Sequence, residues 1–492
     1  MSNILKNEYF LVGLLMLVGL FLCFWLAPYS SFWGDESMVL NLTYKTNSQI
    51  VNFLLTQEAT PPLYYFLIKA VRVTLGDKES YFRLISGVFF LLSGLFYYKL
   101  GKKIGGKTTG LISLVMWSTS YFLLYFSKQA RPYGLSAFFS VASFYFFLKC
   151  FDEYKIRNAI FYLFFTILGL YTSYWFALLL IAQIVIFFAG RNKNWKMFWW
   201  MFGAGLAFLP WGIVYLLKFH NYGVGAWIEK PGLATVWESL GYFGWGQWYA
   251  IIPATLIGAV YGFVKKTIDF KKILPPFLCF IIPIVTAFII SQFVPIYTPG
   301  RREIIVIPAF VVLISYLISR IENVKWKIIV AILLMFFSIQ TISDFNAQAK
   351  DWNSSDFSVI SEIKSKINNG DYVVIYGLVN ADFNYYSRRI GMDGMINKIF
   401  FPLEMATNTD SLGPVKILES NPNKLNSELE KLGEQLSAIG NAKIYVFLSG
   451  DQVSGNLTDF LDKKFKRVSQ LIPQEPHMPT WINEVVVYEN KK

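Results

Sequence analysis

Long apolar runs alternate with short polar segments over the first two thirds of the chain. Runs of membrane-spanning length recur between Tyr9 and about Thr341, and mixed polar and apolar pieces follow through Lys492. About 20 consecutive apolar residues cross a bilayer as a helix, so the first region is predicted to be a polytopic α-helical membrane bundle. The chain therefore divides into a transmembrane module, residues 1–341, and a second domain, residues 342–492.

One apolar stretch, 158–189, is too long for a single crossing at a helical rise of roughly 1.5 Å per residue. Its most polar part, Tyr171–Tyr174, predicts a turn between two short helices. With this hairpin counted as two, the sequence predicts about eleven spans. They are 9–27, 81–98, 108–125, 132–148, the hairpin, 197–217, 248–264, 273–293, 303–319 and 326–341.

The distribution of Lys and Arg predicts the orientation of this bundle. One set of segments is rich in both residues, namely 1–8, 99–107, 149–157, 190–196, 265–272 and 320–327. The longer loops 28–80, 126–131, 218–247 and 294–303 are poorer in them. Since cytoplasmic loops carry the excess of positive charge, the N-terminus is expected in the cytoplasm and residues 342–492 outside the cell membrane.

Residues 342–492 show both helical and strand periodicity. Helices are expected at Ser358–Ile367 and Leu457–Phe465. Extended segments are expected at Tyr372–Ile375, Lys443–Phe447 and Glu484–Tyr488. This alternation predicts a small α/β domain.

Composition excludes several classes of protein. The chain is 54% hydrophobic and only 16% charged, too few charges to solvate a globular surface of 492 residues. The net charge of +13 arises from clusters between apolar runs, which indicates membrane topology and no nucleic-acid partner. Three cysteines and two histidines suggest neither a disulfide framework nor a multi-histidine metal centre.

The first outside loop, 28–80, contains adjacent carboxylates, Asp35 and Glu36, just past the first span. A carboxylate at that depth can act as a general base, although Asp35 can equally cap a following helix. Glu58 lies further along the loop, and the two prolines 61–62 then introduce an amphipathic stretch beginning near Tyr64 and ending at Leu75. That stretch predicts a short helix in the membrane interface, with Tyr64 as either a substrate contact or an anchor.

Basic residues also occur on outside turns, against the general trend of charge. Lys128 and Arg131 lie on the 126–131 turn, and Arg301 and Arg302 lie on the 294–303 loop. The guanidinium group matches phosphate oxygens bidentately, so these residues are candidates for binding a phosphate or pyrophosphate. Binding of ordinary lipid headgroups and pairing with carboxylates are the alternatives.

The loop 218–247 is rich in aromatic residues, among them Trp227 and Trp237. Aromatic rings can stack on a sugar, but tryptophan also gathers at any membrane interface. His220, with an acidic neighbour, is the one candidate ligand for a divalent metal ion. No cofactor is otherwise indicated.

Taken together, these motifs resemble membrane glycosyltransferases of the GT-C fold, in the broad family of protein O-mannosyltransferases and lipid A aminoarabinose transferases. The resemblance covers nearly the whole chain. The matching features are Gly34-Asp35-Glu36, Pro61 to Tyr65, Arg83 entering the second span, Ala130 to Tyr133, the Tyr297–Arg302 loop with Pro308, and Asp351-Trp352.

The resemblance implies a polyprenyl-phosphate sugar donor and a single displacement that inverts the anomeric carbon. In that scheme Asp35 is the catalytic base and Glu36 supports it or binds the acceptor. Lys128, Arg131, Arg301 and Arg302 neutralise the departing lipid phosphate. Candidate substrate contacts are Glu58, Tyr64, Arg83, Tyr133 and Tyr297. The acceptor is a lipid, a glycan or a protein, and membrane lipids surround the bundle.

Two features depart from the pattern of these relatives. Some aminoarabinose transferases carry Glu-Lys before the proline of the first loop, where this chain has Ala59-Thr60. A second acidic residue between spans three and four is missing, with Gln129 nearby. The first difference reduces the similarity to a lipid A aminoarabinose enzyme, and the second implies an acceptor site unlike that of relatives that carry such a residue.

Two other classes of protein fit the topology. A lipid or solute transporter would also be polytopic, but transporters place ionisable residues at the bilayer midplane and show internal repeats. The predicted spans are nearly free of charge at their centres and show no repeat. A noncatalytic scaffold presenting residues 342–492 would leave the arginine turns without a role.

Overall fold

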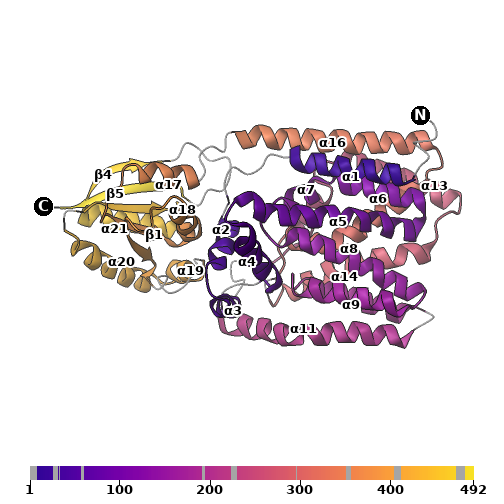
Figure 1. Cartoon of the computed structure of the whole chain (residues 1–492), viewed down its shortest axis with the longest axis horizontal. Helices are drawn as coiled ribbons and strands as arrows, with labels where there is room; N and C mark the ends of the chain where they lie inside the picture. The colour runs from indigo at the N-terminus through magenta and orange to yellow at the C-terminus, as the bar shows by residue number, and fades with distance from the viewer. Residues whose placement is uncertain are drawn as a thin grey trace. The chain divides into compact units, whose positions relative to one another are not determined.

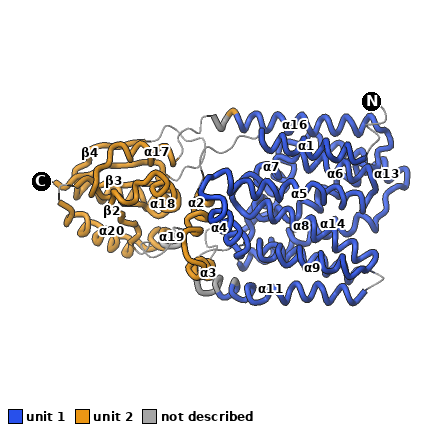
Figure 2. Tube along the Cα trace, in the orientation of Figure 1, with its two compact units in different colours: residues 1–28, 59–346 blue, residues 29–58, 347–492 orange. Residues whose placement is uncertain are grey.

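The computed structural model of the chain describes residues 8–25, 32, 34–56, 60–190, 194–222, 230–294, 296–350, 356–403, 412–440, 442–472 and 482–491. The chain forms two compact units, which Figure 2 distinguishes by colour. Unit 1 comprises residues 1–28 and 59–346, and unit 2 comprises residues 29–58 and 347–492.

Unit 1 is a bundle of helices (Figure 1). Its elements are α1 (Glu8–Trp25), α4 (Leu63–Leu75), α5 (Glu79–Gly105), α6 (Lys107–Thr119), α7 (Tyr121–Ser127), α8 (Tyr133–Asp152), α9 (Ile156–Leu170), α10 (Phe176–Ala189), α11 (Trp195–Tyr222), α12 (Leu233–Phe243), α13 (Trp248–Val264), α14 (Phe270–Ile290), the 3₁₀ helix η1 (Arg302–Val306), α15 (Ile307–Ser319) and α16 (Val324–Lys350).

Within the described residues, seven helices are long and apolar enough to cross a membrane. Two bent pairs, α6 with α7 and α12 with α13, raise this number to nine if each pair is one span. The predicted hairpin is present, because α9 and α10 are short apolar helices separated at residues 171–175. Two predictions need correction: the 218–247 loop contains helix α12, and α16 continues past residue 341 to Lys350.

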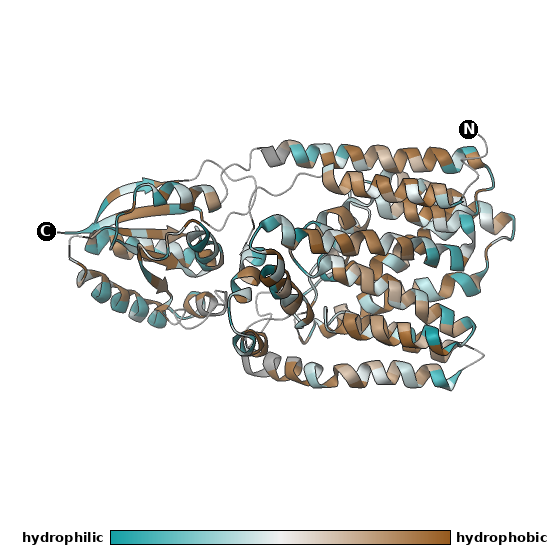
Figure 3. Cartoon of the chain, viewed as in Figure 1, coloured by the Kyte–Doolittle hydropathy of each residue, from teal (hydrophilic) through white to brown (hydrophobic). Residues whose placement is uncertain are grey.

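The helices of unit 1 differ in how much surface they bury. Among the helices long enough to cross a membrane, α8 and η1 with α15 are the most buried, each with 78% of its span buried, so these elements lie inside the bundle. Helix α11 instead exposes Trp199, Phe202, Leu206, Leu209 and Ile213, which recur every three or four residues along one face. Figure 3 shows hydrophobic residues along the outer helices α11 and α16. Such a surface suits the hydrocarbon of a bilayer.

Polar side chains join helices inside the bundle. The Tyr162 hydroxyl donates to Gln183 Oε1 at 2.7 Å, and the Gln183 amide donates to Ser143 Oγ at 3.3 Å. Ser143 also lies 2.9 Å from Thr166 Oγ1. These contacts connect α8, α9 and α10, and hydrogen bonds of this kind between membrane helices contribute about 0.6 kcal/mol each.

Unit 2 is an α/β domain built on a five-stranded mixed sheet. Its elements are α2 (Gly34–Thr43), α3 (Asn47–Thr56), α17 (Asp356–Lys364), β1 (Tyr372–Tyr376), η2 (Gly377–Val379), α18 (Asn380–Arg389), β2 (Asn397–Phe401), α19 (Leu412–Ser420), α20 (Pro422–Ser437), β3 (Ile444–Leu448), α21 (Gln452–Lys464), β4 (Phe465–Leu471) and β5 (Glu484–Asn490). The strand order is β2-β1-β3-β5-β4, with β1 parallel to β2 and β3, and β5 antiparallel to its neighbours.

The two faces of the sheet bury different helices because side chains alternate along each strand. Val374 and Val446 point into a core with leucines of α20 and α21. On the opposite face, the ring of Phe447 lies 4.7 Å from that of Phe383 on α18. All five elements predicted in this domain are present within a few residues of their expected bounds.

Residues 29–58 differ from the sequence-based domain boundary, which assigned them to the membrane module. Helix α2 packs on α18, and the Asn41 amide donates to the Ala381 carbonyl at 2.8 Å. The Tyr386 hydroxyl bonds both backbone groups of Phe32. Because α2 buries Val39, Leu40 and other residues in this way, it belongs with the C-terminal fold.

Candidate active site

A group of basic side chains gathers on the turn between α7 and α8. Lys128 follows α7, and Arg131 precedes Pro132, which fixes the start of α8. Ser86 of α5 donates to the carbonyls of Gln129 at 2.8 Å and Arg131 at 3.2 Å. Arg83 is one helical turn before Ser86, so α5 carries a third cation towards the same turn.

The electrostatics of this basic cluster, Arg83 with Lys128 and Arg131, favour an anion. Burial lowers the pKa of Lys128, the Cys23 thiol opposes this, and the positive charge of Arg83 adds a smaller lowering. Arg131 is itself buried. Cations that oppose one another's charge in a desolvated place are stabilised when a negative group binds among them.

The second predicted basic turn precedes η1. Arg301 is exposed and Arg302 is half-buried. Element η1, which begins at Arg302, packs against α8, whose first residue follows Arg131 by two positions. The two arginine turns therefore lead into neighbouring elements of the same unit.

Tyr297 holds this second turn in place. It is 1% exposed, and its hydroxyl lies 3.1 Å from Ser239 Oγ on α12. Burial raises the pKa of Tyr297, and the nearby Glu303 carboxylate adds to the effect. The carboxylate of Glu303 also accepts from the Gly300 backbone at 2.8 Å. These contacts give Tyr297 a structural role. Its contact with the substrate stays a prediction.

The other two predicted tyrosines are buried as well. Tyr64 is inaccessible to solvent in α4, which begins after the proline pair as expected. Tyr133 is 7% exposed, with its ring 5.1 Å from that of Phe126. The amide of Leu63 donates to the Tyr171 carbonyl at 3.0 Å, so the start of α4 is tied to the turn between α9 and α10.

The predicted base lies in unit 2. Asp35 and Glu36 occupy the first turn of α2, where the helix dipole favours negative charge. Asp35 is half-buried and Glu36 is fully buried. Asp35 therefore keeps part of its surface accessible, whereas Glu36 is enclosed.

A buried pair of carboxyl groups, Asp356 and Asp382, was not anticipated from the sequence. Asp382 of α18 is fully buried, and desolvation raises its pKa well above the usual range. The negative charge of Asp356 raises it further, the neighbouring Ser37 hydroxyl opposes this, and the Asp35 charge adds to the rise. Burial therefore favours the protonated form of Asp382, close to the residue predicted as the base.

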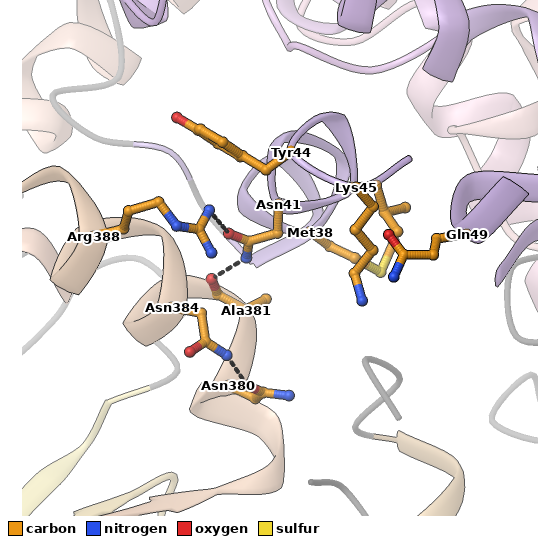
Figure 4. A pocket seen from close by; sticks show the side chains of 10 residues that line it. Met38, Asn41, Tyr44, Lys45, Gln49, Asn380, Ala381, Asn384 and Arg388 are labelled. Carbon is orange, nitrogen blue, oxygen red and sulfur yellow. Dashed lines mark hydrogen bonds between the residues drawn. The ribbon is translucent and has the colours of Figure 1, made fainter. Parts of the chain in front are cut away.

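A pocket of about 350 Å³ lies between α2 and α18, entirely within unit 2 (Figure 4). Its lining residues come from α2 and the segment after it and from the face of α18 turned towards them. They are Met38, Asn41, Leu42, Tyr44, Lys45, Gln49, Asn380, Ala381, Asn384 and Arg388.

The α18 residues of this pocket follow strand β1, after the short turn η2. Ligands of α/β sheets commonly bind at the carboxyl ends of parallel strands, so Asn380, Asp382 and Asn384 carried a signal in the sequence. That signal could not be used without knowing that α2, more than 300 residues earlier, completes the pocket.

Two predicted residues cannot be placed. Glu58 lies outside the described residues, and His220 lies in α11 without a described side chain. Among the described residues, no group of three or more His, Cys, Asp or Glu side chains is arranged to hold a metal ion.

Comparison with known proteins indicates which class of protein this chain resembles. Residues 59–215 match a family model described as dolichyl-phosphate-mannose-protein mannosyltransferase. The structure of ArnT from Cupriavidus metallidurans bound to undecaprenyl phosphate is similar with a TM-score of 0.66 and 11% sequence identity, over 98% of each chain. Its apo structure gives a TM-score of 0.62 with the same identity and coverage.

A more distant structure is an oligosaccharyltransferase from Archaeoglobus fulgidus in complex with zinc and sulfate. Its TM-score is 0.43 at 11% identity, over 77% of this chain and 61% of that one, which is too low to carry an argument. No curated protein sequence matches this chain significantly.

The family match over residues 59–215 and the shared fold indicate a multi-pass membrane glycosyltransferase. Within that class, its overall fold is that of ArnT, and residues 59–215 carry the mannosyltransferase pattern.

Proposed function

We propose that the protein transfers a sugar from a polyprenyl-phosphate donor to an acceptor on the extracytoplasmic side of the membrane, with inversion at the anomeric carbon. The observation that carries this proposal is the basic cluster of Arg83, Lys128 and Arg131, held by α5 on the turn before α8. A structure of the same fold has been solved with undecaprenyl phosphate, a ligand whose chemistry suits such a cluster.

The cluster acts on the leaving group. As the bond from the anomeric carbon to the phosphate oxygen breaks, its electron pair leaves with the phosphate and negative charge grows there. Fixed cations stabilise that charge more in the transition state than in the ground state, which is how they accelerate the step. Arg301 and Arg302 supplement the cluster from the neighbouring turn.

Asp35 acts on the acceptor. The acceptor hydroxyl oxygen forms the new bond to the anomeric carbon, and its proton passes to the Asp35 carboxylate. The base needs to be ionised and reachable, and half-buried Asp35 suits this better than the enclosed Glu36. Glu36 supports the first turn of α2 from within the fold.

The extracytoplasmic orientation is supported by the charges at one end of unit 1. Glu8 at the start of α1 pairs with Lys102 near the end of α5, and Lys103 pairs with Asp152 at the end of α8. This end, rich in Lys, is opposite to the start of α8 that follows Arg131. By the positive-inside rule it faces the cytoplasm and the basic cluster faces outside.

The test uses the purified full chain in lipid nanodiscs with a panel of undecaprenyl-phosphate sugars. Released undecaprenyl phosphate is quantified by mass spectrometry with candidate acceptors present. Asp35→Asn should fold and insert normally yet reduce transfer by about two to four orders of magnitude, because it removes the base and keeps the shape. Asp459→Asn, which neutralises an exposed carboxylate on α21, is the matched control.

Asp35-dependent release would establish the reaction and identify the sugar. Equal turnover by Asp35→Asn and by the control would remove Asp35 from the mechanism. No release from any donor, with divalent ions also supplied, would favour a transporter.

A further inference from the structure

The pocket between α2 and α18 has the composition of a saccharide site. At about 350 Å³ it falls at the lower end of the range for small-molecule sites, about 300–1,000 Å³. Four of its lining side chains are amides, from Asn41, Gln49, Asn380 and Asn384. Asn41 already bonds Ala381 and Arg388, and Asn384 already bonds Asn380 and Lys398. Because an amide has two N–H donors and an oxygen with two lone pairs, each keeps further capacity for the hydroxyl groups of a sugar ring.

The charges around the pocket are predominantly positive. Lys45 and Arg388 line it, and no carboxylate is among its lining residues in the described part of the chain. Behind it, Lys398 donates to Asn384 Oδ1 at 3.0 Å and pairs with Asp393 at 2.7 Å. Arg388 and Lys398 both lie beside the Asp393 carboxylate, and Lys45 adds a further cation to the pocket lining.

Arg388 is oriented before any ligand binds. Its guanidinium lies 4.4 Å over the ring of Tyr44 and donates to Asn41 Oδ1 at 3.4 Å. Its Nε lies 4.0 Å from the Asp393 carboxylate. These contacts fix the plane of the Arg388 guanidinium. That group has five N–H donors, which is more than its contacts to the described residues use. Figure 4 shows Arg388 beside Asn41 and Tyr44. A guanidinium held in this way suits a phosphate or carboxylate.

The pocket also follows the predicted base along one helix. Asp35 and Met38 are three residues apart on α2 and are neighbours on its surface, and Asn41 follows Met38 by a further three residues. At a rise of about 1.5 Å per residue, Asn41 is about 9 Å along the axis from Asp35 and is turned about 120° from it around the helix. Met38, which lines the pocket, is therefore one helical turn from the predicted base.

We propose that this pocket is the acceptor subsite and that it binds an anionic saccharide, a sugar bearing a phosphate or a carboxylate. That the bound saccharide is the acceptor rests on the proposed function, but the binding of an anionic saccharide can be tested independently. A protein acceptor without such a group would be excluded as the substrate.

Binding is measured on the full chain in nanodiscs by saturation-transfer NMR and calorimetry, with glucose 1-phosphate as the probe. Inorganic phosphate and glucose are compared with it, and both should bind more weakly. Arg388→Gln should weaken the probe by about tenfold or more, because a charge-assisted hydrogen bond is lost. Arg388→Lys should restore part of the affinity, and the exposed Lys463→Gln on α21 should change nothing.

The donor site is distinguished by competition. Saturating undecaprenyl phosphate in the nanodisc should leave probe affinity unchanged, and Arg388→Gln should raise the acceptor KM. Displacement of the probe by undecaprenyl phosphate, or equal affinity in Arg388→Gln and the wild type, would overturn the proposal. Lys45→Gln is a second variant of the same pocket. Unchanged probe affinity in both variants would overturn the proposal, and a folding defect could not explain that result. Absence of donor turnover, with Arg388-dependent binding intact, would count against the proposed function and leave the pocket assignment standing.

Discussion

Adding one methyl group at Gly134 should disturb the basic cluster without touching it. A Cβ at this position, at the start of α8, would lie 2.7 Å from the carbonyl oxygen of Ser86 and 3.1 Å from its Cα. Both atoms belong to the α5 backbone and cannot rotate away. Restoring an ordinary contact of 3.4 Å requires the two helices to separate by about 0.7 Å.

That separation acts on the hydrogen bonds that hold the turn. The Ser86 hydroxyl now bonds the carbonyls of Gln129 at 2.8 Å and Arg131 at 3.2 Å. A shift of about 0.7 Å would take them to about 3.5 and 3.9 Å, at or beyond the hydrogen-bonding limit. Overpacking of this kind costs about 1–3 kcal/mol, and misplacement by about 1 Å can cost roughly 100-fold in rate.

Gly134→Ala is therefore expected to reduce donor turnover by about tenfold or more, with a modest loss of thermal stability. The assay is release of undecaprenyl phosphate in nanodiscs, alongside a melting curve. Gly203→Ala on α11 is the control, because a Cβ there meets no atom within 4 Å. Wild-type turnover in Gly134→Ala would refute the reasoning that α5 positions the turn.

Further predictions concern other parts of the molecule. Arg301→Ala or Arg302→Ala should weaken donor binding more than it lowers folding stability. An unchanged donor Kd would instead indicate that the two arginines bind ordinary lipid headgroups. The raised pKa of Asp382 means that its stabilising contribution is complete below about pH 4 and is lost as pH rises through the folded-state pKa. Asp382→Asn should make the melting temperature of unit 2 depend less on pH above pH 4. An identical pH dependence in this variant and in the wild type would contradict the prediction. The three natural cysteines are buried, so Lys463→Cys should react with an impermeant maleimide from outside intact cells, and Lys265→Cys should react only after permeabilisation. The reverse pattern would invert the proposed topology.

Much of the helical framework could be predicted from apolar runs alone. The turn between α9 and α10 was visible because Tyr171–Tyr174 interrupts a run too long for one helix. Strands β1, β3 and β5 were visible because they are buried on both faces. Strand β4 was missed, since it lies at the edge of the sheet and leaves five consecutive residues exposed.

The candidate site was harder to predict, for a physical reason. Residue types with phosphate chemistry could be recognised locally, as Lys128 and Arg131 were. Tyr297 could not be recognised as buried, because the same phenol can contact a sugar or Ser239. The pairing of α2 with α18 depends on a contact across more than 300 residues, which no local periodicity reports.

The discontinuity of unit 2 imposes an order on how the protein is made. Helix α2 leaves the ribosome early, but the sheet and α18 that complete its fold begin at residue 347. At a synthesis rate of roughly 5–20 residues per second, α2 waits about 15–60 s for its partner. During that interval the intervening helices enter the membrane, and the buried face of α2 has no native cover. A truncated chain beginning at residue 347 would face the same difficulty permanently, so the sheet domain cannot be excised at its apparent boundary without leaving α18 bare.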